Sequence, residues 1–555
     1  MSLPDFTTQA ELFSTARLTR TLFAEKDRYG LFAAKVYPAL ARARTQLEKC
    51  YCAENGREAV EPVLLLGVSL LQYLEAIPDR QAVELLRYHA GWNFALNRHV
   101  GDEVFHPTTL VNFRQRLLEH DLSTIGFEAV LQALMDAGLV ARKNRQRLDS
   151  TQMFGRVSRM NRLDCVRETL RLALAELAER LAADQRPAWW SRLWERYVET
   201  QTDYRASMET FTRKLVEAGA DTQELLAWLN TEVDQSLAGG PQTKLLGRVF
   251  AEQFELTAEG AAMARNKQEL SSERVQNPHD PDATYAVKGQ GEQKKEHVGY
   301  KVQVAETVSE TPLAPGEPTN NFIVGMVTHA ARESDEEGDL KMEAEQKAMG
   351  LEKPSVQYVD AAYISAQKLA EAAAARRELI GPAPASPHNN DGRFTSEDFQ
   401  VTVEQRKAIC PAGHENSQCS SLQEKATGRV SYRFEWQSVI CAACPLRDQC
   451  IKKEHKHRTL VVGEHHTLLQ QRREEQKTES FKEKMRHRNA IEGTQSELVR
   501  AHGLRHARYR GLPKAKLQNY FIGAACNLKR WLCRLAWELE QNASAATLQP
   551  SIAAS

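Results

Sequence analysis

The sequence has no net charge, because 73 lysines and arginines are balanced by 73 aspartates and glutamates. It also lacks a long apolar run: the most apolar stretch, residues 63–77, has 15 residues and already includes Gln72 and Glu75. A helix that crosses a bilayer needs about 20 apolar residues, so this stretch predicts a core helix and no membrane partner. The first residues lack the pattern of a secretory signal, and we expect a cytoplasmic location.

Cysteine is scarce, with 10 residues in 555, and this scarcity excludes a disulfide-rich secreted domain. Five of the cysteines fall between residues 410 and 450, in two knuckle-like halves. Four thiolates fit tetrahedral Zn²⁺, so we predict a structural zinc site, with unligated thiols as the alternative. The preferred ligands are Cys410, Cys441, Cys444 and Cys450; Cys419 or His414 can replace one of them, and His455 and His457 are weaker alternatives.

The length predicts about three domains. Hydrophobic residues make up 42% of the chain and charged residues 26%, which is typical of a globular protein with a core. Residues 1–140 have apolar positions at helical spacing, and a helix bearing Arg114 and Arg116 fits either a helix-turn-helix reader or a packing bundle. Residues 162–265 are also helical, and their tryptophans are expected in a core.

The remaining segments predict a mixed α/β sheet that is covered on both faces. Alternating or buried-type apolar runs predict strands over 297–308 and 320–331, and shorter strands end at Asp149 and Asp360. A long charged helix is expected from about 468 to 501.

Two segments are basic although the whole chain is neutral. Residues 484–530 hold 11 lysines and arginines against two acids, and residues 142–162 hold seven against one. Local positive charge is the footprint of a polyanionic ligand, although a solvated basic face is the alternative. The residues expected to grip DNA phosphates are Arg505, Arg508, Arg510, Lys514 and Lys516, with Tyr509 able to stack on an unpaired base and Arg488 near the reacting phosphate.

Three acids stand out by position: Asp149, Asp360 and Glu492. Carboxylates at the ends of neighbouring strands can converge, and a third from a packed helix completes a site for two hard cations such as Mg²⁺ or Mn²⁺. Each acid has an ordinary alternative. Asp149 and Asp360 can be turn or cap residues, and Glu492 with Arg488 can be a helix pair of about 0.2–0.5 kcal/mol. Asp280 and Asp282 are interpreted as loop residues.

Several motifs together resemble the DDE transposases of bacterial insertion sequences, especially the cysteine-containing group named insertion sequence eleven-eighty-two. The resemblance covers about residues 55–533. It rests on LDST, DPDATYAVK, VGYKVQVAET, YVDAAYIS, CPAGH with CAACPLRDQC, and RNAIEG with HGLRHARYRG and NLKR.

The resemblance implies a ribonuclease H-like core in which Asp149, Asp360 and Glu492 hold the metal ions. It also implies that water attacks a phosphodiester at the element's end, and that the freed 3′-hydroxyl then attacks target DNA. Related enzymes carry Tyr, Arg, Glu and Lys around the last acid. Arg488 and Glu492 fit that signature, Met485 and Val499 depart from it, and Arg500 and Tyr509 are candidates to hold terminal bases or phosphates.

The predicted function is therefore a transposase that acts on double-stranded DNA, at terminal inverted repeats and target, as a homodimer on paired ends. The alternatives are a nuclease without integration activity and a catalytically lapsed zinc-containing DNA-binding protein. The expected domains are a helical DNA-binding or assembly domain at 1–140, a catalytic core at 141–161, 266–385 and 466–535, a helical insertion at 162–265, a cysteine-rich insertion at 386–465 and a disordered tail at 536–555.

Overall fold

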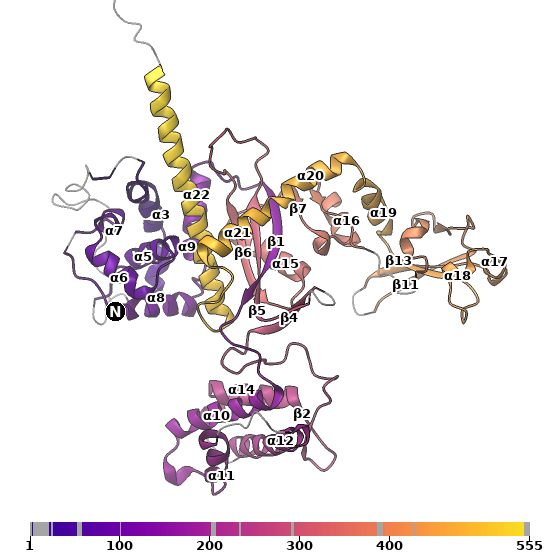
Figure 1. Cartoon of the computed structure of the whole chain (residues 1–555), viewed down its shortest axis with the longest axis horizontal. Helices are drawn as coiled ribbons and strands as arrows, with labels where there is room; N and C mark the ends of the chain where they lie inside the picture. The colour runs from indigo at the N-terminus through magenta and orange to yellow at the C-terminus, as the bar shows by residue number, and fades with distance from the viewer. Residues whose placement is uncertain are drawn as a thin grey trace, which may run out of the picture.

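A six-stranded mixed sheet forms the centre of the computed structural model (Figure 1). Its strands are β1 (Arg145–Phe154), β4 (Thr284–Lys288), β5 (Lys295–Thr307), β6 (Ile323–Ala330), β7 (Val356–Tyr358) and β8 (Glu378–Ile380). The structure describes residues 3, 22–23, 26–52, 58–99, 101–200, 207–231, 235–289, 294–385, 392–425 and 428–548.

The sheet combines antiparallel and parallel pairs, as the sequence predicts. The long strand β5 runs antiparallel to β1 on one side, and on the other it pairs first with β4 and then with β6. Strands β7 and β8 continue the sheet beyond β1 in parallel. Asp149 lies in the middle of β1, so the prediction that this strand ends at Asp149 is wrong: the strand continues as far as Phe154 because β5 pairs with it throughout.

Helices cover both faces of the sheet. Successive strand residues point to opposite faces. On β6, a Cβ at Gly325 would meet Met342 on one helix, whereas the side chain of the neighbouring Met326 would meet a Cβ at Gly523 on another. The expected two-sided cover is therefore confirmed. The helices of the central region are α15 (Asp335–Ala348), η6 (Ala361–Tyr363) and α16 (Ala366–Ala374).

The N-terminal helices share one hydrophobic core with the sheet and the last helix. Tyr73 stacks on Phe521 with ring centroids 5.2 Å apart, and Phe127 lies 6.2 Å from Tyr520. The helices of this part are α2 (Arg28–Leu31), η1 (Phe32–Val36), α3 (Tyr37–Ala41), α4 (Arg44–Leu47), η2 (Glu48–Cys50), α5 (Pro62–Leu74), α6 (Asp79–Tyr88), α7 (Ala90–Ala95), α8 (Thr108–Glu119) and α9 (Ile125–Asp136).

The two arginines of α8 serve packing in this structure. Arg114 is buried and donates to Asp79 at 3.1 Å, and the guanidinium of Arg116 lies 4.8 Å from the ring centre of Tyr51. These contacts favour the packing bundle over a groove-reading helix.

The helical insertion is a separate lobe beyond the end of β1 (Figure 1), with its own hydrophobic core. Trp190 is buried in that core, as expected, and Trp189 and Trp194 pack against it partly buried. The lobe ends in a small hairpin. Its elements are α10 (Arg162–Arg180), η3 (Ala183–Gln185), α11 (Trp190–Trp194), η4 (Glu195–Glu199), α12 (Met208–Thr231), α13 (Gln235–Ala238), α14 (Pro241–Gln253), β2 (Phe254–Leu256) and β3 (Ala262–Ala264).

The cysteine-rich insertion is another lobe with a small core around Phe434 and Trp436. Antiparallel pairing joins β11 to β12 and β12 to β13. Its elements are η7 (Ser396–Asp398), β9 (Gln400–Thr402), β10 (Lys407–Ile409), β11 (Gln418–Gln423), β12 (Val430–Glu435), α17 (Ser438–Ala442), α18 (Arg447–Cys450) and β13 (Thr459–Gly463).

The chain returns to the sheet through α19 (His466–Glu475), α20 (Glu479–Asn489), α21 (Ile491–His502) and α22 (Leu512–Leu548). The prediction of one helix from 468 to 501 is wrong, because Thr478 caps a new helix by accepting from the Phe481 amide. The prediction of a disordered tail from 536 is also wrong as far as 548, since Leu535 and Leu539 still pack on the core. Residues 549–555 lie outside the described part.

Candidate active site

The parallel pairing of β1 with β7 brings Asp149 and Asp360 together. Arg147 is the register partner of Tyr358, and each aspartate follows its paired residue by two positions. Strand β7 ends at Tyr358, and Asp360 caps the short helix η6 by accepting from the Ala362 amide at 2.9 Å. The Asp360 side chain therefore caps η6 and also lies close to Asp149.

The third acid comes from the break between α20 and α21. Glu492 lies in the first turn of α21, and Arg488 lies in the last turn of α20. Arg488 Nη1 is 3.5 Å from Glu492 Oε1, so the helix pair expected from the sequence is present. Helix α20 packs against both β1 and β7, which brings this pair over the two aspartates.

One guanidinium lies among all three carboxylates. Arg488 Nη2 is 3.0 Å from Asp149 Oδ2 and 3.9 Å from Asp360 Oδ2, while Nη1 faces Glu492. Because two of these distances share one nitrogen, the aspartates approach the same point in space. The three carboxylates therefore lie around one guanidinium, and Arg488 is their shared positive partner.

Burial decreases steadily across the three acids. The exposed fraction of the side chain is 12% for Asp149, 39% for Asp360 and 72% for Glu492. Burial raises the pKa of Asp149, and the nearby Arg488 opposes that shift. Convergent carboxylate oxygens at an open surface suit hard divalent cations and leave room for a large substrate. The donor set therefore fits Mg²⁺ or Mn²⁺.

A buried charge network lies directly behind the site, and it was not predicted. Arg147 and Glu306 are cross-strand partners on β1 and β5, and their side chains form an ion pair. Glu306 is 0% exposed and also binds Arg530 and the Thr494 hydroxyl, the latter at 2.7 Å. Arg147 donates to the carbonyl of His487 at 3.2 Å, next to Arg488. The network thus ties α20, α21 and α22 to the sheet.

The basic loop after α21 is attached to the end of β1. Phe154 donates to the Arg505 carbonyl and accepts from the Ala507 amide, both at 2.8 Å. The Arg505 side chain donates to the Gln152 carbonyl at 3.0 Å, and the guanidinium of Arg508 lies 4.8 Å from the Tyr73 ring centre. These contacts fix the course of the loop beside the acids.

The other predicted DNA-contacting residues differ in exposure. Tyr509 is half-buried, with the guanidinium of Arg114 5.5 Å from its ring centre, so its face is already in contact with a cation. Three cations are exposed: Arg500, Arg510 and Lys514. Lys516 is half-buried.

The two departures from the family signature are packing residues. Met485 is half-buried against the apolar cluster around Phe481 and Tyr358. Val499 packs partly buried against the main core. The neighbouring Arg500 is the exposed cation at this point of the helix.

Asp280 and Asp282 hold the start of α22. Asp280 accepts from the Tyr300 hydroxyl at 2.6 Å and from the Gly511 amide at 3.1 Å, and Asp282 accepts from the Leu512 amide at 2.9 Å. Both residues lie in a loop, as predicted. Their contacts assign them to fixing the helix after the basic loop, away from the three converging acids.

The cysteine-rich insertion places the four preferred cysteines around one small pocket. Cys410, Cys441, Cys444 and Cys450 all line it, together with His414, whereas Cys419 lies on β11 outside it. Burial is the largest cause of the raised pKa of Cys450, and the other three thiols raise it further. The four thiols are therefore close enough to interact electrostatically. A set of four sulfurs and an imidazole is the donor chemistry of structural zinc.

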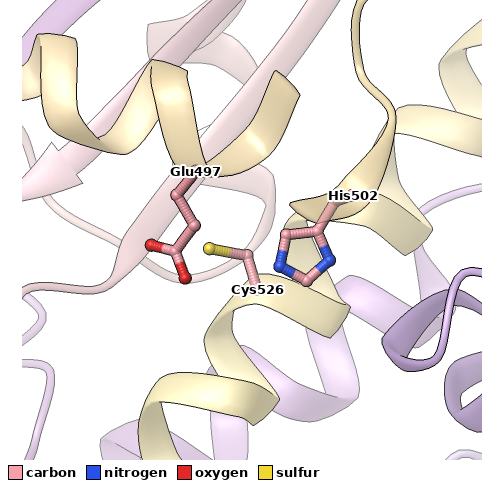
Figure 2. A group of neighbouring side chains, drawn as sticks. All are labelled: Glu497, His502 and Cys526. Carbon is pink, nitrogen blue, oxygen red and sulfur yellow. The ribbon is translucent and has the colours of Figure 1, made fainter. Parts of the chain in front are cut away.

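A second group with metal-ligand chemistry lies between α21, which carries Glu497 and His502, and α22, which carries Cys526 (Figure 2). Ligand atoms of Glu497, His502 and Cys526 all lie within 4.8 Å of one another. The Glu497 carboxylate already accepts from Arg530 at 2.8 Å. Burial lowers the pKa of His502 to about 4 and raises the pKa of Cys526 to about 12, so both are neutral at pH 7. We therefore describe this group as packing beside the buried charge network.

None of the helices in the described part of the chain combines the length and apolar character that a bilayer crossing requires. Two family models match the sequence. Residues 409–532 match the family described as "Transposase DDE domain", and residues 21–116 match the one described as "Transposase domain (DUF772)". No curated protein and no solved structure matches the chain.

The DDE-domain match includes Glu492, the cysteine pocket and the basic loop, while Asp149 and Asp360 precede it. The other match covers N-terminal helices that share a core with α22. Two separate segments of one chain therefore match transposase domains, and together they support a DDE transposase of an insertion sequence.

Proposed function

We propose that this transposase hydrolyses phosphodiester bonds at the terminal inverted repeats of its element and joins the freed ends to target DNA. The observation that carries the proposal is the convergence of Asp149, Asp360 and Glu492 on one guanidinium. An isolated helix pair or cap would not bring three acids from β1, η6 and α21 together. The convergence favours a catalytic protein over a lapsed one.

In the proposed mechanism the three acids hold two divalent cations, as the carboxylate donor set allows. When bound, these cations stabilise negative charge on the attacking and leaving oxygens. Arg488 compensates the acids in the free protein, and beside DNA it is placed to pair with a phosphate oxygen. The buried pairing of Arg147 with Glu306 holds the strand and helices that carry these groups.

The exposed cations Arg500, Arg510 and Lys514 extend the site along the DNA backbone, where each phosphate contact adds salt-dependent affinity. We further propose a homodimer, since two element ends must be handled together. The nuclease alternative keeps the same acids and metal ions but lacks the joining step, so the products of the reaction separate the two.

The proposal predicts that Asp360→Ala abolishes both cleavage and joining of labelled terminal-repeat DNA in the presence of Mg²⁺. The loss should be about 10²–10³-fold or more, the scale for removing a group that stabilises transition-state charge. The matched control is Glu336→Ala, which removes an exposed carboxylate at the start of α15. Activity of Asp360→Ala equal to that of the wild type would refute the assignment. Cleavage without joining by the wild type would favour the nuclease.

The cysteine pocket predicts about one tightly held zinc ion per chain. Cys441→Ser and Cys444→Ser should each lose that zinc and unfold the insertion at lower temperature, because metal binding contributes directly to folding. Zinc content by mass spectrometry and thermal unfolding of the full chain measure both effects. Cys419→Ser, outside the pocket, is the control and should keep its zinc. Equal zinc content in all three variants would contradict the site.

A further inference from the structure

The junction between the sheet and the helical insertion contains a pocket with an unusual charge composition. Its volume is about 630 Å³, and we call it the basic neck pocket. Four of the side chains that line it are cationic, and none of its described lining residues is an aspartate or glutamate. The lining residues used below are Arg159, Arg162, Lys267 and Arg274, and the lining also includes the apolar Met208 and Phe211.

The positive charge of this pocket is largely uncompensated. Arg162 donates to the side-chain oxygen of Gln253 at 2.7 Å and to the Arg265 carbonyl at 2.8 Å, and Arg274 donates to the Ser271 carbonyl at 2.9 Å. These acceptors are neutral. Burial lowers the pKa of Arg162 and of Arg274, and in each case a neighbouring arginine lowers it further. Like charges held together in this way favour an anionic ligand.

Two nearby carboxylates give the pocket little compensation. Glu252 accepts from the Val275 amide and from Arg248 Nε, both at 2.8 Å. Glu296 is 3.8 Å from Arg159, and both side chains of that pair are exposed. An exposed pair at such a distance contributes little, so it leaves Arg159 available to a stronger anion.

The pocket continues the basic surface of the candidate active site. The loop carrying Arg505 and Arg508 is joined to the end of β1, and Arg156 donates to the Arg508 carbonyl at 2.8 Å. Arg156 is followed by Arg159 and then by Arg162, where α10 begins. A line of cations therefore leads from the three acids, along β1, to the insertion.

We propose that the helical insertion is a second DNA-binding element, and that the basic neck pocket holds backbone phosphates of the same duplex whose end lies at the three acids. The proposal rests on the proposed function for the identity of the polyanion. In this proposal residues 162–265 bind the duplex at a position within the element, while the sheet carries out the reaction at the end of the element.

The length of β1 gives a lower limit for the distance between the three acids and the basic neck pocket. Five residues separate Asp149 from Phe154, about 17 Å at roughly 3.3 Å per residue. The insertion lies beyond that end of the strand (Figure 1). Since duplex DNA rises about 3.4 Å per base pair, the pocket meets the duplex at least about five base pairs from the acids.

The test is metal-free DNA binding by the full chain, measured by fluorescence anisotropy across salt concentrations. The probe is a duplex of about 30 base pairs, roughly three helical turns. Arg159→Ala with Lys267→Ala should make the plot of log K against log salt less steep by about 0.9 for each phosphate that the variant no longer binds. The control pair is Arg213→Ala with Lys244→Ala, on the same lobe but outside the pocket.

An unchanged slope in the pocket variant, or an equal change in the control, would overturn the proposal. Folding of each variant is checked by its thermal unfolding, and both pocket substitutions remove exposed side chains. A wild type that binds DNA but does not cleave it would refute only the proposed function. A wild type that does not bind the duplex would refute both.

Discussion

Asp149→Asn is expected to eliminate DNA cleavage while leaving the protein folded. The substitution removes the most buried of the three acids and with it one charge from the proposed metal site. Activity should fall by about 10²–10³-fold or more, on the scale for lost transition-state electrostatics. Asparagine keeps an oxygen that can accept from the Ser150 amide, which Asp149 does at 2.8 Å, so the local backbone contact is preserved.

The stability of this variant has a defined pH dependence. Burial raises the pKa of Asp149 above its usual value, so the folded chain disfavours the charged carboxylate. In the wild type this cost is absent at acidic pH, below both pKa values, and it develops as the pH rises through the raised pKa. An asparagine side chain cannot ionise. The variant should therefore be as stable as the wild type or slightly more stable near neutral pH, with the gain disappearing in acid.

Activity and chemical denaturation of the same preparations separate the two effects. Loss of cleavage with unchanged unfolding supports a catalytic role for Asp149. Loss of cleavage together with a large loss of stability would instead make Asp149 a structural residue. Full activity in Asp149→Asn would exclude it from the proposed metal site.

Glu306→Gln is expected to cause the largest loss of stability among single substitutions near the site. Glu306 is fully buried between Arg147 and Arg530 and also binds Thr494. Removing its charge leaves two buried guanidinium groups with only part of their compensation. Breaking a buried ion pair by removing one partner costs about 3–5 kcal/mol, so the free energy of unfolding should fall by about that amount.

The matched control is Glu310→Gln. This residue follows β5 and pairs with Arg145 at the start of β1, but its side chain is 54% exposed. An exposed pair contributes about 0–1 kcal/mol, so denaturant unfolding of the control should differ little from that of the wild type. Similar losses in both variants would show that Glu306 does not hold the network together. Weakened activity in Glu306→Gln at temperatures where it stays folded would indicate that the network also positions Arg488.

Much of the sheet could be predicted because the pattern of apolar residues that indicates a strand lies within the strand itself. Alternating apolar residues in the segment that forms β5, and a continuous apolar run in the segment that forms β6, identify strands wherever they pair. The length of β1 could not be predicted, because it depends on pairing with a strand about 150 residues later in the chain. Likewise, the break at Thr478 depends on one capping hydroxyl, which a continuous charged pattern conceals.

The three acids were predicted by chemistry and resemblance, whereas their common partner required the structure. Spacing in the sequence showed Arg488 beside Glu492 on a helix, but not that it also faces Asp149 and Asp360. Glu306 was missed for a related reason. It lies on the same face of β5 as the buried Val302 and Val304. The period of the strand predicts that such a position is buried, but it does not predict which cations will neutralise an acid there.

The shared core of the N-terminal helices and α22 has a consequence for synthesis in the cell. Tyr73 and Phe127 are translated several hundred residues before their partners Phe521 and Tyr520. Contacts this distant along the chain form slowly and cannot close before the partner segment exists. The N-terminal helices therefore keep this apolar surface exposed until α22 has been synthesised, and a chain that stops before α22 lacks that helix's part of the core and Arg530.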